Sequence, residues 1–427
     1  MGEVREGYKM TELGEIPSEW DYNQLSKYVA IKSGIAPSKL EDINELGEYP
    51  YYKVDDMNYA SKYLIKAKNN FDNCQDYKLL KVNSIIFPKR GASIFTNKIA
   101  ITTQLCMIDT NLMVLEVNDS NQLDYEYLYY NLLAKELSKI ADTSSIPQIN
   151  NKHIENIKIL VPLIEEQQKI ASILSTVDEQ IDETEQLIVK IKELKKGLMQ
   201  QLLTKGIGHT EFKQTELGEI PAEWDLYKFE NLVEAIDGDR GKNYPSEEDF
   251  SQTGYCLFLS AQNMTKSGFN FKVAKYISKE KHELLRSGVV RKGDLILTSR
   301  GSKLGRIALF EDEKNYPVVR INSSMLILRK KNVDFIGKYL VYFLHGIFLP
   351  EYLKKAKVGS AQPHITKKDL NNQSIILPTL EEQQKIAQIL STVDEQIEVY
   401  EQEKAKYEEL KKGLMQQLLT GQIRVKI

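Results

Sequence analysis

The sequence predicts an α+β protein in which two mixed α/β domains alternate with two long helices. A 43-residue segment occurs twice, at 162–204 and 378–420, with 32 of 43 positions identical. A shorter segment, TELGEIP, begins at Thr11 and again at Thr215. The two regions between these repeats barely resemble each other. The identical parts therefore serve one task that is performed twice, and the divergent parts serve two different tasks.

The first domain is expected at residues 1–161. Strand-like runs at Ser84–Phe87, Ile99–Thr102 and Leu112–Val117 precede a helical stretch from Tyr125 to Ile140. Trp20 stands at the entry of the region and is interpreted as a core anchor. This order of elements predicts a mixed α/β fold.

The first copy of the long repeat predicts a helix over 162–207. Pro162 suits a helix start because its missing N–H costs little there, and Glu165 and Glu166 suit the positive end of the helix dipole. Apolar residues recur at helical spacing, and glycine follows shortly after Thr204. A helix of this length would extend about 60 Å.

The second domain, 208–377, carries the same faint skeleton, with strand-like runs at Leu295–Thr298, Ile307–Phe310 and Ser324–Leu328 and a helical stretch from Phe335 to Phe348. Trp224 takes the place of Trp20. The second helix is expected over 378–427, with a capping box formed by Thr379 and Glu382.

Each long helix carries an apolar stripe that water would expose, so the two helices are expected to pack together. An antiparallel coiled coil with an internal pseudo-two-fold axis places the divergent domains at opposite ends. In the alternative, each helix covers only its own domain. Gly197 and Gly413 lie inside the helices, where glycine costs about 1 kcal/mol relative to alanine. Close approach of a second helix or a kink would account for them.

Composition excludes several classes of protein. No apolar run approaches the roughly 20 residues that span a bilayer, and the charged N-terminus has no signal-peptide core. Three cysteines without a CxxC pair fit a reducing cytoplasm, and each is read as a small buried hydrophobe. The net charge is −3, but residues 225–377 hold 25 basic against 17 acidic residues. A field of this sign attracts nucleic-acid phosphates.

Catalytic motifs are largely missing. The chain has neither a phosphate-binding GxxxxGK[ST] nor a GxGxxG sequence, and its five histidines show no metal-ligand spacing, so no catalytic residue, metal or cofactor is assigned to it. Asp312 and Lys314 form an acid-x-Lys pair that would suit a metal-dependent nuclease, the third-ranked hypothesis.

Polar side chains after matching strand-like runs are the candidates for recognition. Arg90 and Arg300 each precede a glycine, a placement that can project a bidentate donor toward a guanine edge or a phosphate. A structural turn with a solvated arginine is the alternative. The candidate DNA contacts are Lys53, Lys89, Arg90, Ser93 and Lys98 in the first domain and Gln262, Asn263, Ser299, Arg300, Lys303 and Arg306 in the second.

The repeats PxxEEQQKIAxILSTVDEQI (Pro162–Ile181, Pro378–Ile397) and LKKGLMQQLLT (Leu194–Thr204, Leu410–Thr420) resemble those of the specificity (S) subunits of type I restriction-modification systems. The resemblance covers the whole chain. It implies two target-recognition domains that each read half of a split site in double-stranded DNA. It further implies a coiled-coil spacer that docks two methyltransferase (M) subunits, which two restriction (R) subunits would join.

The resemblance places S-adenosylmethionine and base flipping in the methyltransferase subunits, with no cofactor in this chain. The first domain is near neutral, which departs from the basic groove expected of a DNA reader. Because the identical helix ends would meet equal partners, the candidate docking residues are Glu166, Gln167, Gln168, Lys195, Lys196, Glu382, Gln383, Gln384, Lys411 and Lys412. The runner-up hypothesis is a non-catalytic coiled-coil scaffold whose globular ends bind proteins.

Overall fold

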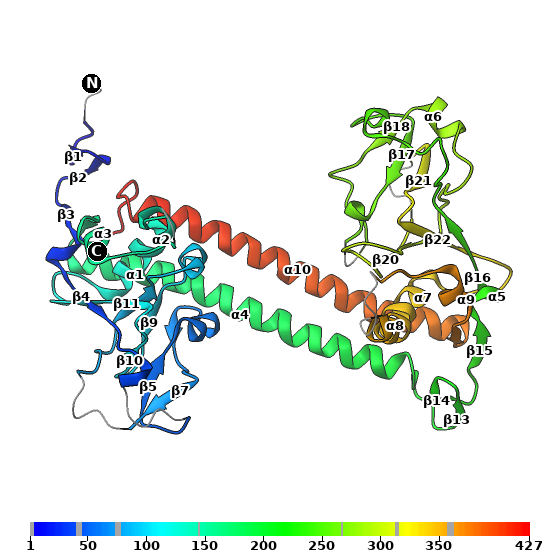
Figure 1. Ribbon diagram of the computed structural model, residues 1–427, viewed down its shortest axis with the longest axis horizontal. Coiled ribbons are helices and arrows are strands. Elements are labelled where there is room, and N and C mark those ends of the chain that lie inside the picture. The colour runs from blue at the N-terminus through cyan, green and yellow to red at the C-terminus, as the bar shows by residue number, and fades with distance from the viewer. Residues whose placement is uncertain are drawn as a thin grey trace. The chain divides into compact units, whose positions relative to one another are not determined.

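One order of elements occurs twice along the chain (Figure 1). The computed structural model describes residues 4–39, 45–72, 78–143, 146–265, 268–311, 316–356 and 363–427. These residues form two compact units, one of residues 1–186 with 401–427 and one of residues 187–400. The boundaries of the units cut through both long helices, so each unit contains one half of each helix.

The first unit is built on a five-stranded sheet in the order β4-β11-β8-β9-β6, in which only β6 and β9 pair in parallel. A three-stranded sheet β10-β5-β7, the ladder β3-β12 and the hairpin β1-β2 complete its strands. Its strands are β1 Tyr8–Thr11, β2 Gly14–Pro17, β3 Asp21–Gln24, β4 Val29–Ser33, β5 Tyr49–Tyr52, β6 Tyr63–Leu64, β7 Asn69–Phe71, β8 Ile85–Pro88, β9 Ala100–Thr102, β10 Met107–Ile108, β11 Leu112–Val117 and β12 Lys158–Val161.

The shorter helices of the first unit lie between its strands along the chain. They are the short turns η1 Leu25–Lys27, η2 Pro37–Lys39, η3 Val54–Tyr59 and η4 Ala92–Thr96, and the α-helices α1 Tyr125–Lys135, α2 Leu137–Ile140 and α3 Asn151–Glu155. The predicted helix Tyr125–Ile140 is divided into α1 and α2 because Glu136 adopts a positive φ of 56° between them.

The second unit repeats the antiparallel core as β16-β22-β19-β20, with β18-β17-β21, β15-β23 and the hairpin β13-β14 beside it. Its strands are β13 Phe212–Thr215, β14 Gly218–Pro221, β15 Asp225–Lys228, β16 Val233–Asp237, β17 Cys256–Leu259, β18 Tyr276–Ile277, β19 Leu295–Thr298, β20 Ile307–Leu309, β21 Val318–Ile321, β22 Met325–Lys330 and β23 Ser374–Leu377. The strand-like runs predicted in both domains all coincide with strands.

Its helices are α5 Phe229–Leu232, η5 Glu247–Asp249, η6 Ala261–Asn263, α6 Lys279–Glu283, α7 Gly337–Phe343, the π-turn η7 Leu344–Phe348, α8 Leu349–Ala356 and α9 Lys367–Asn371. The two long helices are α4 Ile164–Leu202 and α10 Leu380–Leu418. Each has 39 residues and begins two positions after the predicted proline.

Both long helices contribute to both hydrophobic cores. In the first unit, Trp20 packs in one cluster with Leu174 from the start of α4 and with Leu418 from the end of α10. In the second unit, Trp224 packs with Leu390 from the start of α10 and Leu202 from the end of α4. Both tryptophans are fully buried, which confirms their assignment as core anchors. The alternative in which each helix covers only its own domain is therefore wrong.

Within each unit, the two helix segments run in opposite directions. In the first unit, Lys411 forms an ion pair with Asp178 at 2.5 Å, and Lys404 pairs with Glu185 farther along α4. In the second unit, Lys195 pairs with Asp394 at 2.5 Å. The Lys411–Asp178 and Lys195–Asp394 pairs occupy equivalent positions in the two copies of the repeat, so one contact is made once in each unit.

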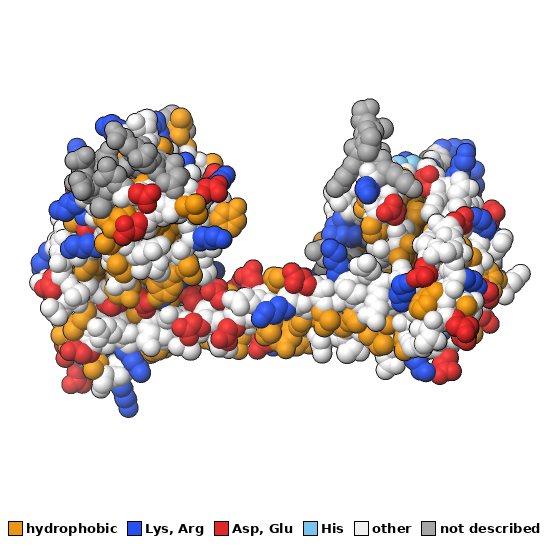
Figure 2. Space-filling view, turned by 90° about the horizontal axis from the view of Figure 1, so that it is seen from below, with side chains coloured by type: hydrophobic (Ala, Val, Ile, Leu, Met, Phe, Trp, Pro, Cys, Tyr) orange, Lys and Arg blue, Asp and Glu red, His pale blue; other side chains and the backbone are white. Residues whose placement is uncertain are grey.

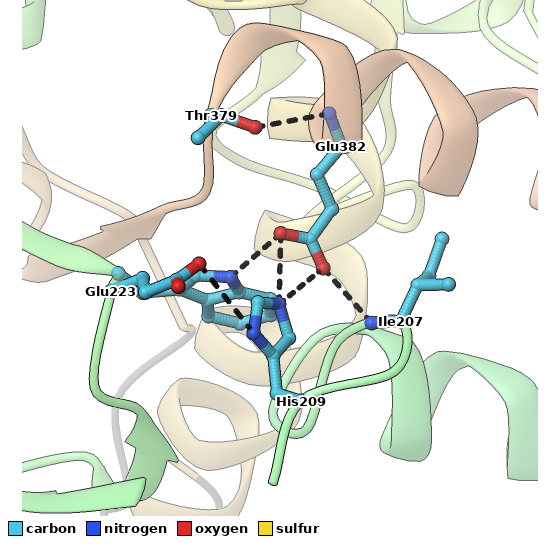
Figure 3. Close-up of polar contacts among 6 residues, drawn as sticks. Ile207, His209, Glu223, Thr379 and Glu382 are labelled. Carbon is cyan, nitrogen blue, oxygen red and sulfur yellow. Dashed lines mark hydrogen bonds and ion pairs between the residues drawn. The ribbon is translucent and has the colours of Figure 1, made fainter. Parts of the chain in front are cut away.

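A buried glutamate joins each domain to the start of its helix. In the first unit, the Trp20 indole Nε1 donates to Glu166 at 3.0 Å, and Arg424 donates two further hydrogen bonds. In the second unit, Trp224 donates to Glu382 at 2.9 Å, and the imidazole of His209 lies 2.9 Å from the same carboxylate (Figure 3). The carboxylates fix each domain to a helix start.

The predicted capping box of the second helix is half right. The Thr379 hydroxyl accepts a hydrogen bond from the backbone N–H of Glu382 at 3.3 Å (Figure 3). The Glu382 side chain does not return this bond, because its carboxylate is taken by Trp224, His209 and the Ile207 N–H.

The helix glycines do not serve close packing against a described neighbour. A Cβ atom placed on Gly197 or Gly413 would meet no described atom within 4 Å. The close-approach explanation is therefore wrong within this chain, and the continuous helices give no support to a kink.

Candidate nucleic-acid interface

In the second unit, the loop after β19 and the turn after β17 are tied together by basic side chains. The Lys303 ammonium donates to the carbonyl oxygens of Gln262 and Met264, each at 3.1 Å, and the Arg306 guanidinium donates to Met264 O at 2.7 Å. The loop after β19 is thereby held against η6 after β17. Lys303 and Arg306, which were predicted as DNA contacts, therefore hold the two loops together. The side chain of Gln262, another predicted contact, is exposed.

Arg300 is the predicted contact that the second unit leaves most available. Its Nε atom is buried and has no hydrogen-bond partner among the described residues. The neighbouring strand end is fixed because Ile365 N–H donates to Ser299 O at 3.0 Å. Because Nε is enclosed, a phosphate or a base edge would meet the other guanidinium nitrogens, which form no hydrogen bond with a described residue.

Two further basic groups stand near Arg300. Burial lowers the pKa of His364, and the positive charges of Arg300 and Arg240 lower it further. Arg240 comes from the loop after β16 and donates to Asp237 at 3.3 Å. Neither Arg240 nor His364 was predicted from the sequence as a contact. The signal for Arg240 was present in the run DGDRGK that directly follows a strand, and His364 lies in AQPHI, the counterpart of SIPQI in the first domain.

Asn263 and Ser299 do not fit the predicted role in DNA contact. Asn263 is 1% exposed, and its amide is used by Ser260, Asn270 and Val273 within the turn. Ser299 is fully buried, and its hydroxyl donates to Ser324 O at 2.9 Å. Both side chains instead hold the loops in shape.

The first unit repeats this joining of loops with other side chains. The Lys98 ammonium donates to the Asn58 side chain, which connects η4 after β8 to η3 after β5. Gly91 N–H donates to Pro147 O at 2.8 Å, so residues 146–149 lie on the loop as residues 363–365 do in the second unit. The faint sequence skeleton therefore marks a shared loop arrangement.

The predicted contacts of the first unit are only partly free. Arg90 is exposed, whereas the Lys89 ammonium donates to Ser33 at 2.9 Å and has its pKa lowered by burial. Ser93 donates to Arg90 O at 3.2 Å. The Lys53 ammonium lies 5.8 Å from the centre of the Tyr51 ring. Arg90 is thus the counterpart of Arg300 that this surface offers to a ligand.

The predicted docking residues divide into inward and outward groups. Glu166, Gln167 and Gln383 are buried, Glu382 is held by Trp224 and His209, and Lys195 and Lys411 are committed to the ion pairs between the helices. The residues that face outward are Gln168, Lys196, Gln384 and Lys412. On the face drawn in Figure 2, acidic side chains stand along the long helices.

The described residues offer little for catalysis. None of their histidines, cysteines and acids forms a group of three or more that could hold a metal ion. Asp312 and Lys314, the nuclease candidates, lie outside the described residues, as does Cys74. Cys106 and Cys256 are buried, as predicted, and burial raises the pKa of their thiols to about 12 and about 11. No helix in the described part of the chain is long and apolar enough to cross a membrane.

The sequence is similar to known proteins over both halves of the chain. The family model "Type I restriction modification DNA specificity domain" matches residues 17–193 and again 221–409. The type I restriction enzyme MjaVIII specificity subunit of Methanocaldococcus jannaschii is 31% identical over 434 residues, which cover 99% of this chain and 97% of that protein. The putative MjaX specificity subunit of the same organism is also 31% identical, over 450 residues, with the same two coverages.

The fold has a solved counterpart. The crystal structure of a type I restriction-modification S subunit from M. genitalium matches with a TM-score of 0.59 at 16% identity, covering 96% of this chain and 98% of that one. With two family matches, one on each half, this chain belongs to the family of type I restriction-modification specificity subunits, which are non-catalytic DNA-recognition components.

Proposed function

We propose that the two domains read the two halves of a bipartite, asymmetric site in double-stranded DNA, and that α4 and α10 form the antiparallel coiled coil that sets the distance between the halves. The proposal rests on one observation: the contacts between the two helices, and between each domain and its helix, are repeated while the loops differ. Asp178–Lys411 and Asp394–Lys195 are equivalent pairs, and so are Trp20–Glu166 and Trp224–Glu382.

This repetition supports an internal pseudo-two-fold axis. Equal helix contacts in the two halves would present the same surface twice, which suits two equal partners. In the proposal these partners are two methyltransferase subunits, through which two restriction subunits join. The complex acts in the cytoplasm, with S-adenosylmethionine bound by the methyltransferase subunits.

The loops at the strand ends would carry the sequence information. Arg300 and Arg240 make the second reader basic, and residues 225–377 carry the excess of positive charge. In the first reader, Arg90 is the exposed counterpart. Arginine can pair with guanine through two hydrogen bonds, and lysine and arginine also bind phosphates. This basic field is the feature that favours DNA reading over the protein-binding scaffold.

The spacer is tested by shortening both helices by the same amount. Seven residues, close to two helical turns, would be removed from 184–190 and from 399–405, the segments around the Glu185–Lys404 ion pair. The loss of seven residues shortens a helix by about 10 Å, which corresponds to about three base pairs of DNA. Two turns also keep the apolar stripe on the same face.

The readout is the methylated sequence in a methylation-free host that also expresses the cognate methyltransferase subunit. The proposal predicts the same two half-sites, separated by a spacer about three base pairs shorter. A matched control removes seven residues from one helix only, which breaks the pairing and should abolish methylation. Altered half-site bases with an unchanged spacer would contradict the proposal.

A further inference from the structure

A groove occurs at equivalent places in the two units. In the first unit, it lies between the start of α1 and the first half of α4, has a volume of about 350 Å³, and is lined by Asp124, Tyr125, Glu126, Gln168, Ala171, Ser172, Ser175, Thr176 and Glu179. In the second unit, it lies between the start of α7 and the first half of α10 and has a volume of about 570 Å³. The helix wall of this second groove consists of Gln384, Ala387, Gln388, Ser391, Thr392 and Glu395.

The helix walls of the two grooves match position by position. The six helix residues of one groove stand at the same places in the repeat as the six of the other, and only Ser172 and Gln388 differ. Their spacing puts them on one face of each helix. The walls that the domains supply differ: Asp124 to Glu126 line the first groove, and Leu309, Glu311 and Ile336 to Lys338 line the second.

Several of the identical positions are exposed, which makes their identity informative. Gln168, Thr176 and Glu179 are exposed, as are Gln384, Thr392 and Glu395. A buried position stays the same because packing constrains it, but surface positions tolerate most substitutions. The neighbouring segment 182–192, which keeps three of eleven residues in common with its copy, shows how far the two copies have otherwise diverged. A ligand that binds to each helix wall in the same way would account for the identity of these residues.

The charges of the groove indicate the chemistry of that ligand. In the first unit, Glu126 is already paired with Lys62 at 3.0 Å, and Asp124 caps α1 by accepting from Tyr127 N–H at 2.8 Å. Glu179 and Glu395 have no hydrogen bond or ion pair with any described residue. The domain wall of the second groove adds Glu311 and Lys338, whose charges offset each other. Each groove therefore offers an unpaired carboxylate at the same position of the repeat, which suits a lysine or arginine of the ligand. Neighbouring donors of that ligand could reach Gln168 and Thr176 or their copies.

We propose that these two grooves each receive the same basic segment of one methyltransferase subunit, so that one subunit binds per groove. The inference rests on the proposed function, because it takes the partner from there and assigns its contact surface. Two copies of one protein need two equal sites, and these grooves are equal on the helix side. The unequal domain walls would then be tolerated by the segment and would contribute less to binding.

The test reverses the shared charge. Glu179→Lys, Glu395→Lys and the double variant would each be mixed with the cognate methyltransferase subunit, and the complexes would be weighed by native mass spectrometry. We expect the unaltered chain to bind two subunits and each single variant to bind one. The double variant should bind none, even at subunit concentrations tenfold above the dissociation constant of the unaltered chain. Circular dichroism of each variant alone would show that the helices remain folded, as expected for exposed positions.

A matched control lies on the same helices outside the grooves. Glu193 and Glu409 occupy equivalent positions of the repeat, and both are exposed. Glu193→Lys with Glu409→Lys should leave the complex with two subunits. If these control variants lose the subunits and the groove variants keep them, docking occurs at the other helix ends and the groove assignment is overturned. If the unaltered chain binds no methyltransferase subunit, the proposed function itself fails.

Discussion

The two halves of this chain use the same contacts to hold a domain to its helices, but they complete those contacts with different partners. In the first unit, Arg424 neutralises Glu166, which is fully buried. In the second unit, His209 and a backbone N–H approach Glu382, whose side chain is 12% exposed. The repeated carboxylate and tryptophan set the attachment, and the surrounding groups set how strongly each half depends on it.

The largest expected effect is the loss of Arg424. The Arg424→Ala variant leaves the Glu166 carboxylate buried with the Trp20 N–H as its remaining side-chain donor. We expect the free energy of unfolding of the first unit to fall by about 2–4 kcal/mol. Hydrogen exchange followed by mass spectrometry, on peptides from β3 and β12, would measure this change.

The matched variant in the second unit is His209→Ala. Because Glu382 keeps Trp224 and the Ile207 N–H and reaches solvent, we expect a loss of about 1 kcal/mol in the peptides from β15 and β23. Equal losses in the two units would show that the two attachments do not differ as the geometry indicates.

The stability of the second unit should depend more strongly on acid than that of the first. Burial lowers the pKa of His345, near the end of α7, to about 4. The equivalent position of α1 is Leu133, three residues after the tyrosine that contacts the helix aspartate. Between pH 6.5 and pH 4 the unfolded chain binds a proton at His345 that the folded chain does not, so the second unit loses up to about 3 kcal/mol as the pH falls.

The variant His345→Leu makes the second unit resemble the first. It should remove this part of the acid sensitivity, as measured by urea unfolding at pH 7 and pH 4.5. An unchanged difference in stability between the two pH values would assign the acid sensitivity to other groups.

Under the proposed function, the two domains should differ in the half-site that they control. Arg300→Ala should weaken recognition of the second half-site by about 1–3 kcal/mol and leave the first unchanged. Arg90→Ala should do the opposite. Competition binding of the assembled complex to duplexes altered in one half-site measures both effects. A loss that is spread equally over both half-sites would mean that the arginines bind phosphates without selecting sequence.

The smallest expected effect concerns the helix glycines. Gly197→Ala and Gly413→Ala should each stabilise the chain by about 0.5–1 kcal/mol, because the added methyl group meets no described atom. Thermal unfolding of the isolated chain measures the gain. A matched decrease in the affinity for the methyltransferase subunit would explain why glycine stands at both positions, and destabilisation of the isolated chain would contradict the open surroundings.

The sequence was sufficient to predict the two mixed domains, the long helices and the main strands, because these elements are marked locally. The helix repeat, the apolar strand-like runs and the tryptophans each signal their own structure through periodicity or burial. Both long helices begin two residues after the prolines, and in each one a glutamine side chain, Gln167 or Gln383, donates to the carbonyl oxygen of that proline. The break at Glu136 has no local signal in the sequence.

The recognition residues were harder to predict because their roles depend on long-range contacts. Lys303 and Arg306 look like free cations in sequence, but they bind carbonyl groups about forty residues away along the chain. Ser299 and Asn263 look exposed in a polar loop, and both are buried. Arg240 and His364 join Arg300 only through folding, so the cluster could not be recognised from any one segment.

The central claim is that two different readers are held at a fixed distance by one pair of helices. Its most direct test is genome-wide mapping of modified bases after the chain is expressed with its cognate methyltransferase subunit in a methylation-free host. The account predicts a single motif with two different short halves, separated by a constant number of unspecified base pairs. A continuous motif, two identical halves or a variable separation would contradict it.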